Sequence, residues 1–126
     1  MIFAFVEDGT VEVLASESAA RTWEPIDVES RVVVFYADDG TWLEPRFTRP
    51  NRHRFFGWVL EQGAFELVRN PAGHPTIDSI DAALSEAVAL EPNPYFRTID
   101  DIRRHLAARR PSEAQAESMK GPRDHE

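Results

Sequence analysis

The chain has 126 residues, a net charge of −8 and no cysteine. This length predicts one domain with its own hydrophobic core. The absence of cysteine excludes disulfides, thiol nucleophiles and thiolate metal sites, and it is typical of a reducing compartment, so we expect a cytoplasmic protein. No segment approaches the roughly 20 apolar residues of a membrane span. The acidity predicts repulsion from nucleic acid and attraction to basic partners.

The N-terminal part of the chain predicts a hairpin followed by a short helix. Two apolar segments, 2–6 and 10–14, flank an Asp-Gly pair. Such a pair favours a type I′ turn, because both central positions of that turn need a positive φ. Ser16 is a typical N-cap residue, and we expect a helix that begins there and ends before Pro25. Residues 24–30, three of which are acidic, then form a connector.

The longest apolar run, residues 31–37, predicts a strand in the interior of a sheet. Its β-branched and aromatic side chains occupy both faces of the strand. A second Asp-Gly pair predicts a hairpin into a strand at 41–47. Pro45 has no N–H to donate, so we expect this strand at an edge or with a bulge at Pro45. A loop at 48–54 follows, and strands at 55–60 and 64–69 complete the sheet.

Helical periodicity follows a break rich in proline and glycine at 70–75. Apolar residues at i, i+3, i+4 spacing predict one helix over 76–90 and another over 99–110. Residues 111–126 are polar and contain two prolines, so we expect a disordered tail. We therefore predict a single α+β domain over 1–110: an antiparallel sheet of about six strands with helices packed on one side, two of them C-terminal.

No pattern in the sequence indicates a catalytic, metal or cofactor site. The four histidines lack ligand spacing, whereas zinc needs three or four converging ligands. Asp38 and Asp39 are adjacent, whereas the paired carboxylates of acid–base catalysis face each other across a pocket. A hairpin tip explains both acids better. We expect a protein that is not an enzyme and that binds no metal or cofactor.

Two clusters are candidates for binding surfaces. Residues 46–54 contain four arginines and are flanked by aromatics, a composition that suits single-stranded nucleic acid. The acidity of the whole chain favours the other interpretation, in which these arginines pair with acids of the protein itself. An acidic and aromatic set offers a surface for a basic protein partner, since oriented acids speed association and aromatics form hot spots. This set is Asp27, Glu29, Asp38, Asp39 and Trp42; a solvated acidic face is the alternative.

Residues 24–69 resemble a recurring block in small bacterial proteins. Its segments are I-D-V-E (26–29), V-V-F-Y-A-D-D-G (33–40), L-E-P-R-F-T-R-P-N-R (43–52) and F-F-G-W (55–58). In size, acidity and layout such proteins are similar to immunity proteins of bacterial toxin systems, including those of type VI secretion. The resemblance implies a cytoplasmic protein that neutralises a cognate toxin or effector by covering its active site or substrate surface. The alternative is a small regulatory or nucleic-acid-binding module that uses the arginine-rich loop 46–54.

Overall fold

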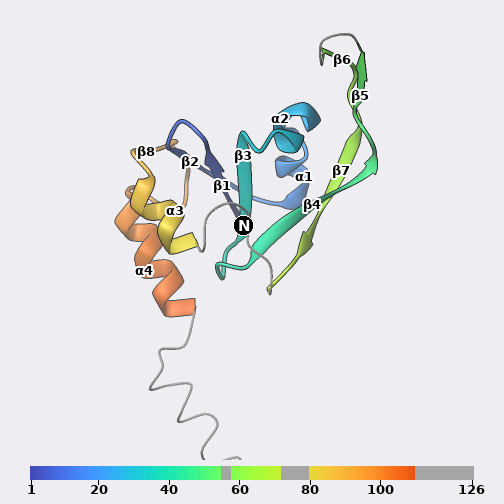
Figure 1. Cartoon of the computed structure of the whole chain (residues 1–126). Coiled ribbons are helices and arrows are strands. Elements are labelled where there is room, and N and C mark those ends of the chain that lie inside the picture. The colour runs from blue at the N-terminus through green and yellow to red at the C-terminus, as the bar shows by residue number, and fades with distance from the viewer. Residues whose placement is uncertain (55–57, 72–79, 110–126) are drawn as a thin grey trace, which may run out of the picture.

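A six-stranded sheet forms the centre of the molecule, with the strand order β7-β4-β3-β1-β2-β8 (Figure 1). The computed structural model describes residues 1–54, 58–71 and 80–109. Every pairing in this sheet is antiparallel except the short parallel pairing of β2 with β8. The α+β class is therefore confirmed. The strands are β1 (Ile2–Val6), β2 (Thr10–Leu14), β3 (Val33–Ala37), β4 (Trp42–Arg49), β7 (Ala64–Arg69) and β8 (Ala89–Leu90).

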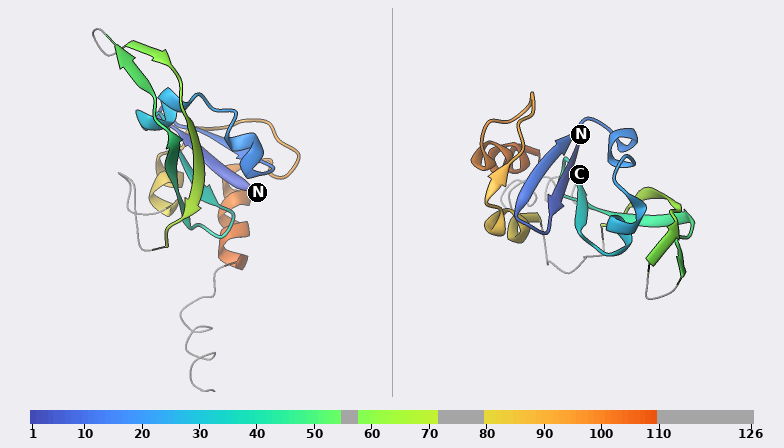
Figure 2. Two further views of the ribbon diagram at one scale, coloured as in Figure 1. Left: turned by 90° about the vertical axis from the view of Figure 1, so that its right-hand side faces the viewer. Right: turned by 90° about the horizontal axis from the view of Figure 1, so that it is seen from above.

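Helices cover both faces of the sheet, as the view from above shows (Figure 2). On one face, Phe3 and Phe5 pack with residues of α3 and α4. On the other face, Ile2 and Phe35 pack with α1 and α2. The prediction that the helices lie on one side is wrong, because β1 and β3 are apolar on both faces and each face needs a cover. The helices are α1 (Glu17–Ala20), α2 (Pro25–Glu29), α3 (Ile80–Glu86) and α4 (Ile99–Arg109).

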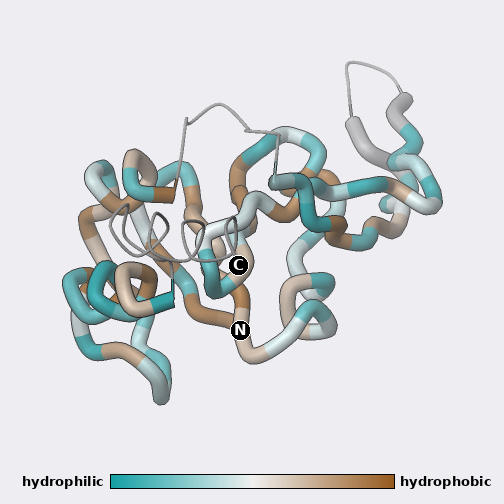
Figure 3. The backbone as a smooth tube through the Cα atoms, turned by 90° about the horizontal axis from the view of Figure 1, so that it is seen from below, coloured by the Kyte–Doolittle hydropathy of each residue, from teal (hydrophilic) through white to brown (hydrophobic). Residues whose placement is uncertain are grey.

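Hydropathy along the backbone agrees with this layering. In Figure 3 the chain that follows the N-terminus is brown, and these hydrophobic residues are those of β1. Strand β1 pairs with β2 on one side and with β3 on the other, so it lies in the middle of the sheet. The prediction that β3 is an interior strand is also confirmed, because β3 pairs with both β1 and β4.

The two Asp-Gly hairpins form as predicted, but with a different turn. Gly9 and Gly40 have φ values of 94° and 93°, and neither preceding aspartate has a positive φ. The N–H of Gly40 donates to the carbonyl of Ala37 at 3.0 Å, which describes a three-residue loop with glycine in the left-handed position. The carboxylate of Asp39 accepts from the N–H of Thr41 at 3.0 Å, and this local bond favours the observed turn over type I′.

Several element boundaries differ from the sequence prediction. Helix α2 occupies the expected connector, because proline suits the first turn of a helix as well as its end. The expected loop at 48–54 contains β5 (Arg52–Arg54), which pairs with β6 (Trp58–Glu61) in a separate two-stranded sheet. The helix expected over 76–90 is described only from residue 80, and its last two residues are β8. The predicted tail, 111–126, lies outside the described residues.

Candidate functional site: the gap between β3 and β4

Strands β3 and β4 pair over only two positions and then diverge (Figure 1). The pairs are Phe35 with Leu43 and Tyr36 with Trp42. If this register continued, Val33 would face Pro45, which has no N–H to donate to a neighbouring strand. Beyond Leu43, β4 pairs with β7 alone, and its register shifts between Phe47 and Arg49. Pro45 therefore lies on a stretch with one partner strand, and the bulge comes after it rather than at it.

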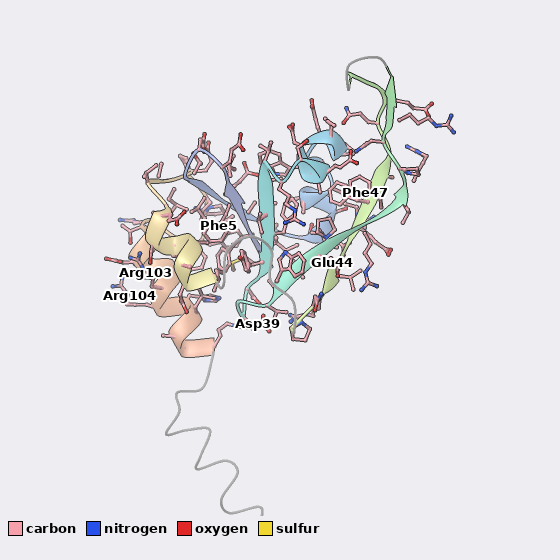
Figure 4. The ribbon with its side chains drawn as sticks, in the orientation of Figure 1. Phe5, Asp39, Glu44, Phe47, Arg103 and Arg104 are labelled. Atoms are coloured by element: carbon pink, nitrogen blue, oxygen red, sulfur yellow. The ribbon has the colours of Figure 1, made fainter. Side chains whose placement is uncertain are left out.

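The divergence leaves a hollow of about 200 Å³, which we call the β3–β4 gap. Its apolar lining includes Val34, Trp42 and Phe47, which are half-buried rather than buried. Figure 4 shows Glu44 and Phe47 along β4, on the stretch that has left β3. The charged lining consists of Glu29, Arg31 and Glu44. An apolar hollow with a charged rim is the arrangement that a protein anchor residue requires.

Asn51 fixes the acidic helix α2 beside the gap. Its amide nitrogen donates to the carbonyl of Pro25 at 3.2 Å and to the carboxylate of Glu29 at 2.8 Å. Its amide oxygen accepts from the N–H of Gly63 at 2.7 Å. Asn51 is buried, and it ties three segments that are far apart in the sequence. The sequence contains no signal for this role, because an asparagine after a proline is equally typical of an ordinary loop.

Arg31 follows α2 in a left-handed conformation, with φ 62°. Its N–H donates to the backbone carbonyl of Val28 at 3.2 Å. The next N–H, of Val32, donates to the backbone carbonyl of Asp27 at 2.9 Å. This is the Schellman ending of a helix, at a position where glycine is the usual residue. The exposed Arg31 side chain forms no ion pair within the described ranges. A non-glycine residue in this conformation often marks a functional position.

The five predicted partner-binding residues do not form one surface. Asp27 and Glu29 belong to α2, which precedes β3, whereas Asp38 and Asp39 follow β3 at its other end. A strand of five residues separates the two pairs by roughly 17 Å. Only Glu29 and Trp42 line the β3–β4 gap.

The two acids at the hairpin tip have partners within the protein. Asp38 lies 3.5 Å from the guanidinium of Arg109 at the end of α4, and Asp39 lies 3.0 Å from that of Arg69. Figure 4 shows Asp39 at the end of the hairpin. Burial raises the pKa of Asp39, but hydrogen bonds from Thr41 and the charge of Arg69 outweigh it and hold the pKa at about 2. These acids join the hairpin to its neighbours.

The arginine-rich segment is partly neutralised by the same means. Arg46 lies 3.6 Å from Glu44, and Arg52 lies 3.0 Å from Glu61. Arg49 has no ion-pair partner in the part of the chain that is described. Strands β5 and β6 project away from the body of the molecule (Figures 1 and 2). The segment therefore forms part of a projecting ribbon in which two of the four arginines are paired with acids of the protein itself.

Residues 1–54, 58–71 and 80–109 contain no group of three or more metal-ligating side chains that could hold an ion. None of the helices within these ranges is long and apolar enough to cross a membrane.

No protein-family model, curated protein or solved structure matches the chain. The candidate site therefore rests on the geometry of the β3–β4 gap.

Proposed function

We propose that this chain is an immunity-type protein, which acts in the bacterial cytoplasm by binding a cognate toxin or effector and covering its active site or substrate surface. The β3–β4 gap is the observation that carries the proposal. It combines the half-buried rings of Trp42 and Phe47 with the carboxylates of Glu29 and Glu44. Tryptophan side chains that become fully buried on association provide much of the binding energy of protein interfaces.

The charge of the chain supports a basic partner. The net charge is −8, and acidic proteins attract basic surfaces at long range. Beside the gap, the carboxylates of Glu24 and Asp27 have no ion-pair partner in the described ranges. Exposed acids at the rim of an interface mainly raise the association rate, whereas a buried aromatic anchor slows dissociation. Such a protein inhibits by occupying a surface and needs no chemistry of its own.

A regulatory or nucleic-acid-binding module that uses residues 46–54 is the second candidate. The projecting ribbon favours it, and so does Arg49, which has no ion-pair partner among the described residues. The ion pairs of Arg46 and Arg52 disfavour it, because those cations are already compensated. The net charge of the chain also opposes the phosphate contacts on which nucleic-acid affinity depends.

Co-expression tests the proposal. The product of the neighbouring gene is expressed in a heterologous host with and without this protein, and growth is measured. We expect the neighbour alone to arrest growth, and the full chain to restore growth and to co-purify with it. In the same assay Glu29→Gln is compared with Asp38→Asn, whose carboxylate lies far from the gap. Growth arrest without rescue, or equal rescue by both variants without any complex, would contradict the proposal.

A further inference from the structure

A second hollow of about 200 Å³ lies beside the β1–β2 turn and the end of α3, and it shares Arg31 and Val34 with the lining of the β3–β4 gap. Its inner wall is apolar and includes Phe5, Val34 and Ala83. The rings of Phe5 and Tyr36 meet there edge to face, with their centroids 5.4 Å apart. The volume lies below the roughly 300–1,000 Å³ of pockets that hold drug-sized ligands. The hollow therefore suits a small molecule.

Tyr36 also lines this hollow, and it is only 1% exposed. Its hydroxyl is closed off from solvent and has no hydrogen-bond partner among the described residues, so a ligand in the hollow meets the ring of Tyr36 and not its hydroxyl. Burial raises the pKa of Tyr36 to about 12, so the phenol stays neutral and adds no charge to the apolar wall.

Three charged side chains line the same hollow: Glu7, Glu86 and Arg31. None of the three forms an ion pair within the described ranges, although their charges are opposite. Most other arginines of these ranges are paired, as Arg103 is with Asp100 on α4 (Figure 4). Opposite charges that face one hollow without contacting each other suit a ligand that carries both signs.

We propose that this hollow binds a free α-amino acid with a small apolar side chain. The guanidinium of Arg31 donates to the ligand carboxylate. The carboxylates of Glu7 and Glu86 accept from its ammonium group. The side chain of the ligand packs against Phe5. The left-handed conformation of Arg31 fits this role, because strained residues persist at binding positions. This ligand site goes beyond the proposed protein-binding function, and Arg31 and Val34 line both hollows.

The test is an NMR titration of the ¹⁵N-labelled full chain with L-valine, n-propylamine and propionate. We expect saturable shifts at Phe5, Val34 and Ala83 with L-valine. The two half-ligands should bind about tenfold more weakly, because each lacks one charged contact. Shifts of equal affinity with propylamine would mean a simple cation site, and with propionate a simple anion site. Either result, or no saturable shift at these residues, would overturn the proposal.

Matched variants locate the contacts. Arg31→Gln and Glu86→Gln should each weaken L-valine binding about tenfold. The controls Arg97→Gln and Glu91→Gln change exposed charges outside the hollow and should leave binding unchanged. If Arg31→Gln and Glu86→Gln both bind L-valine as tightly as their controls, the assignment is wrong.

Discussion

Replacing Arg31 with glycine should stabilise the protein. Arg31 has φ 62° at the end of α2, and the left-handed region costs an L-residue about 1–2 kcal/mol. Glycine removes this cost, but it adds about 0.4–1 kcal/mol of conformational entropy to the unfolded chain. The exposed Arg31 side chain has no ion pair to lose among the described residues. We therefore expect a net gain of about 0.5–1 kcal/mol in the free energy of unfolding.

Urea unfolding followed by far-UV circular dichroism measures this gain. In thermal unfolding of a chain of this size, a gain of about 1 kcal/mol corresponds to a rise in Tm of about 3–5 °C. Arg97→Gly is the matched control, because Arg97 is exposed and its φ is not positive. The control gains only the unfolded-state entropy and should be destabilised by about 0.4–1 kcal/mol. If the two variants shift the midpoint in the same direction, the left-handed conformation of Arg31 does not carry the expected strain.

Three further changes probe the fold around the site. Asn51→Ala should lower the free energy of unfolding by about 2 kcal/mol, because it leaves the buried N–H of Gly63 without an acceptor, and urea unfolding measures the loss. Glu17→Ala should lower it by about 1 kcal/mol and increase aggregation, since Glu17 accepts from the N–H of Leu67 on the edge strand β7 at 3.0 Å; Glu17→Gln, which keeps an acceptor, should lose less. The folded-state pKa of Asp39, about 2, lies below its ordinary value of 3.8, so its contribution is complete above pH 4 and is lost as the pH falls toward 2. Asp39→Asn should flatten the pH dependence of stability in that window by about 1 kcal/mol, after allowance for solvent screening, and an unchanged slope would contradict this.

The sequence predicted those elements whose signals are local. Continuous apolar runs identified β1 and β3, alternating apolar residues identified β2, and the periodicity at 99–110 identified α4 within one residue. Asp-Gly identified both hairpins, although the hydrogen bond from the aspartate selected another turn. Each of these signals depends on residues that are neighbours in the sequence.

The missed features depend on distant contacts or on residues with two uses. Pro25 can end a helix or begin one, and it begins α2. Strand β8 is two residues long and exists through its pairing with β2. The candidate site was anticipated in part: Trp42 and Glu29 do line the gap, but the position of Pro45 opposite Val33 follows from the register between strands. Periodicity within one segment does not specify such a register.

The most direct test of the proposed interface is the dissociation constant of the complex between the captured partner and the Trp42→Ala variant. Trp42 lines the β3–β4 gap, whereas Tyr95 is an aromatic residue that is 48% exposed and lies outside the gap. After both variants have been shown to fold, we expect Trp42→Ala to raise the Kd by about 30-fold or more, the loss of a hot spot worth about 2 kcal/mol. Tyr95→Ala should change it by less than about threefold. A Trp42→Ala variant that binds within threefold of the wild type would show that the partner does not use the β3–β4 gap.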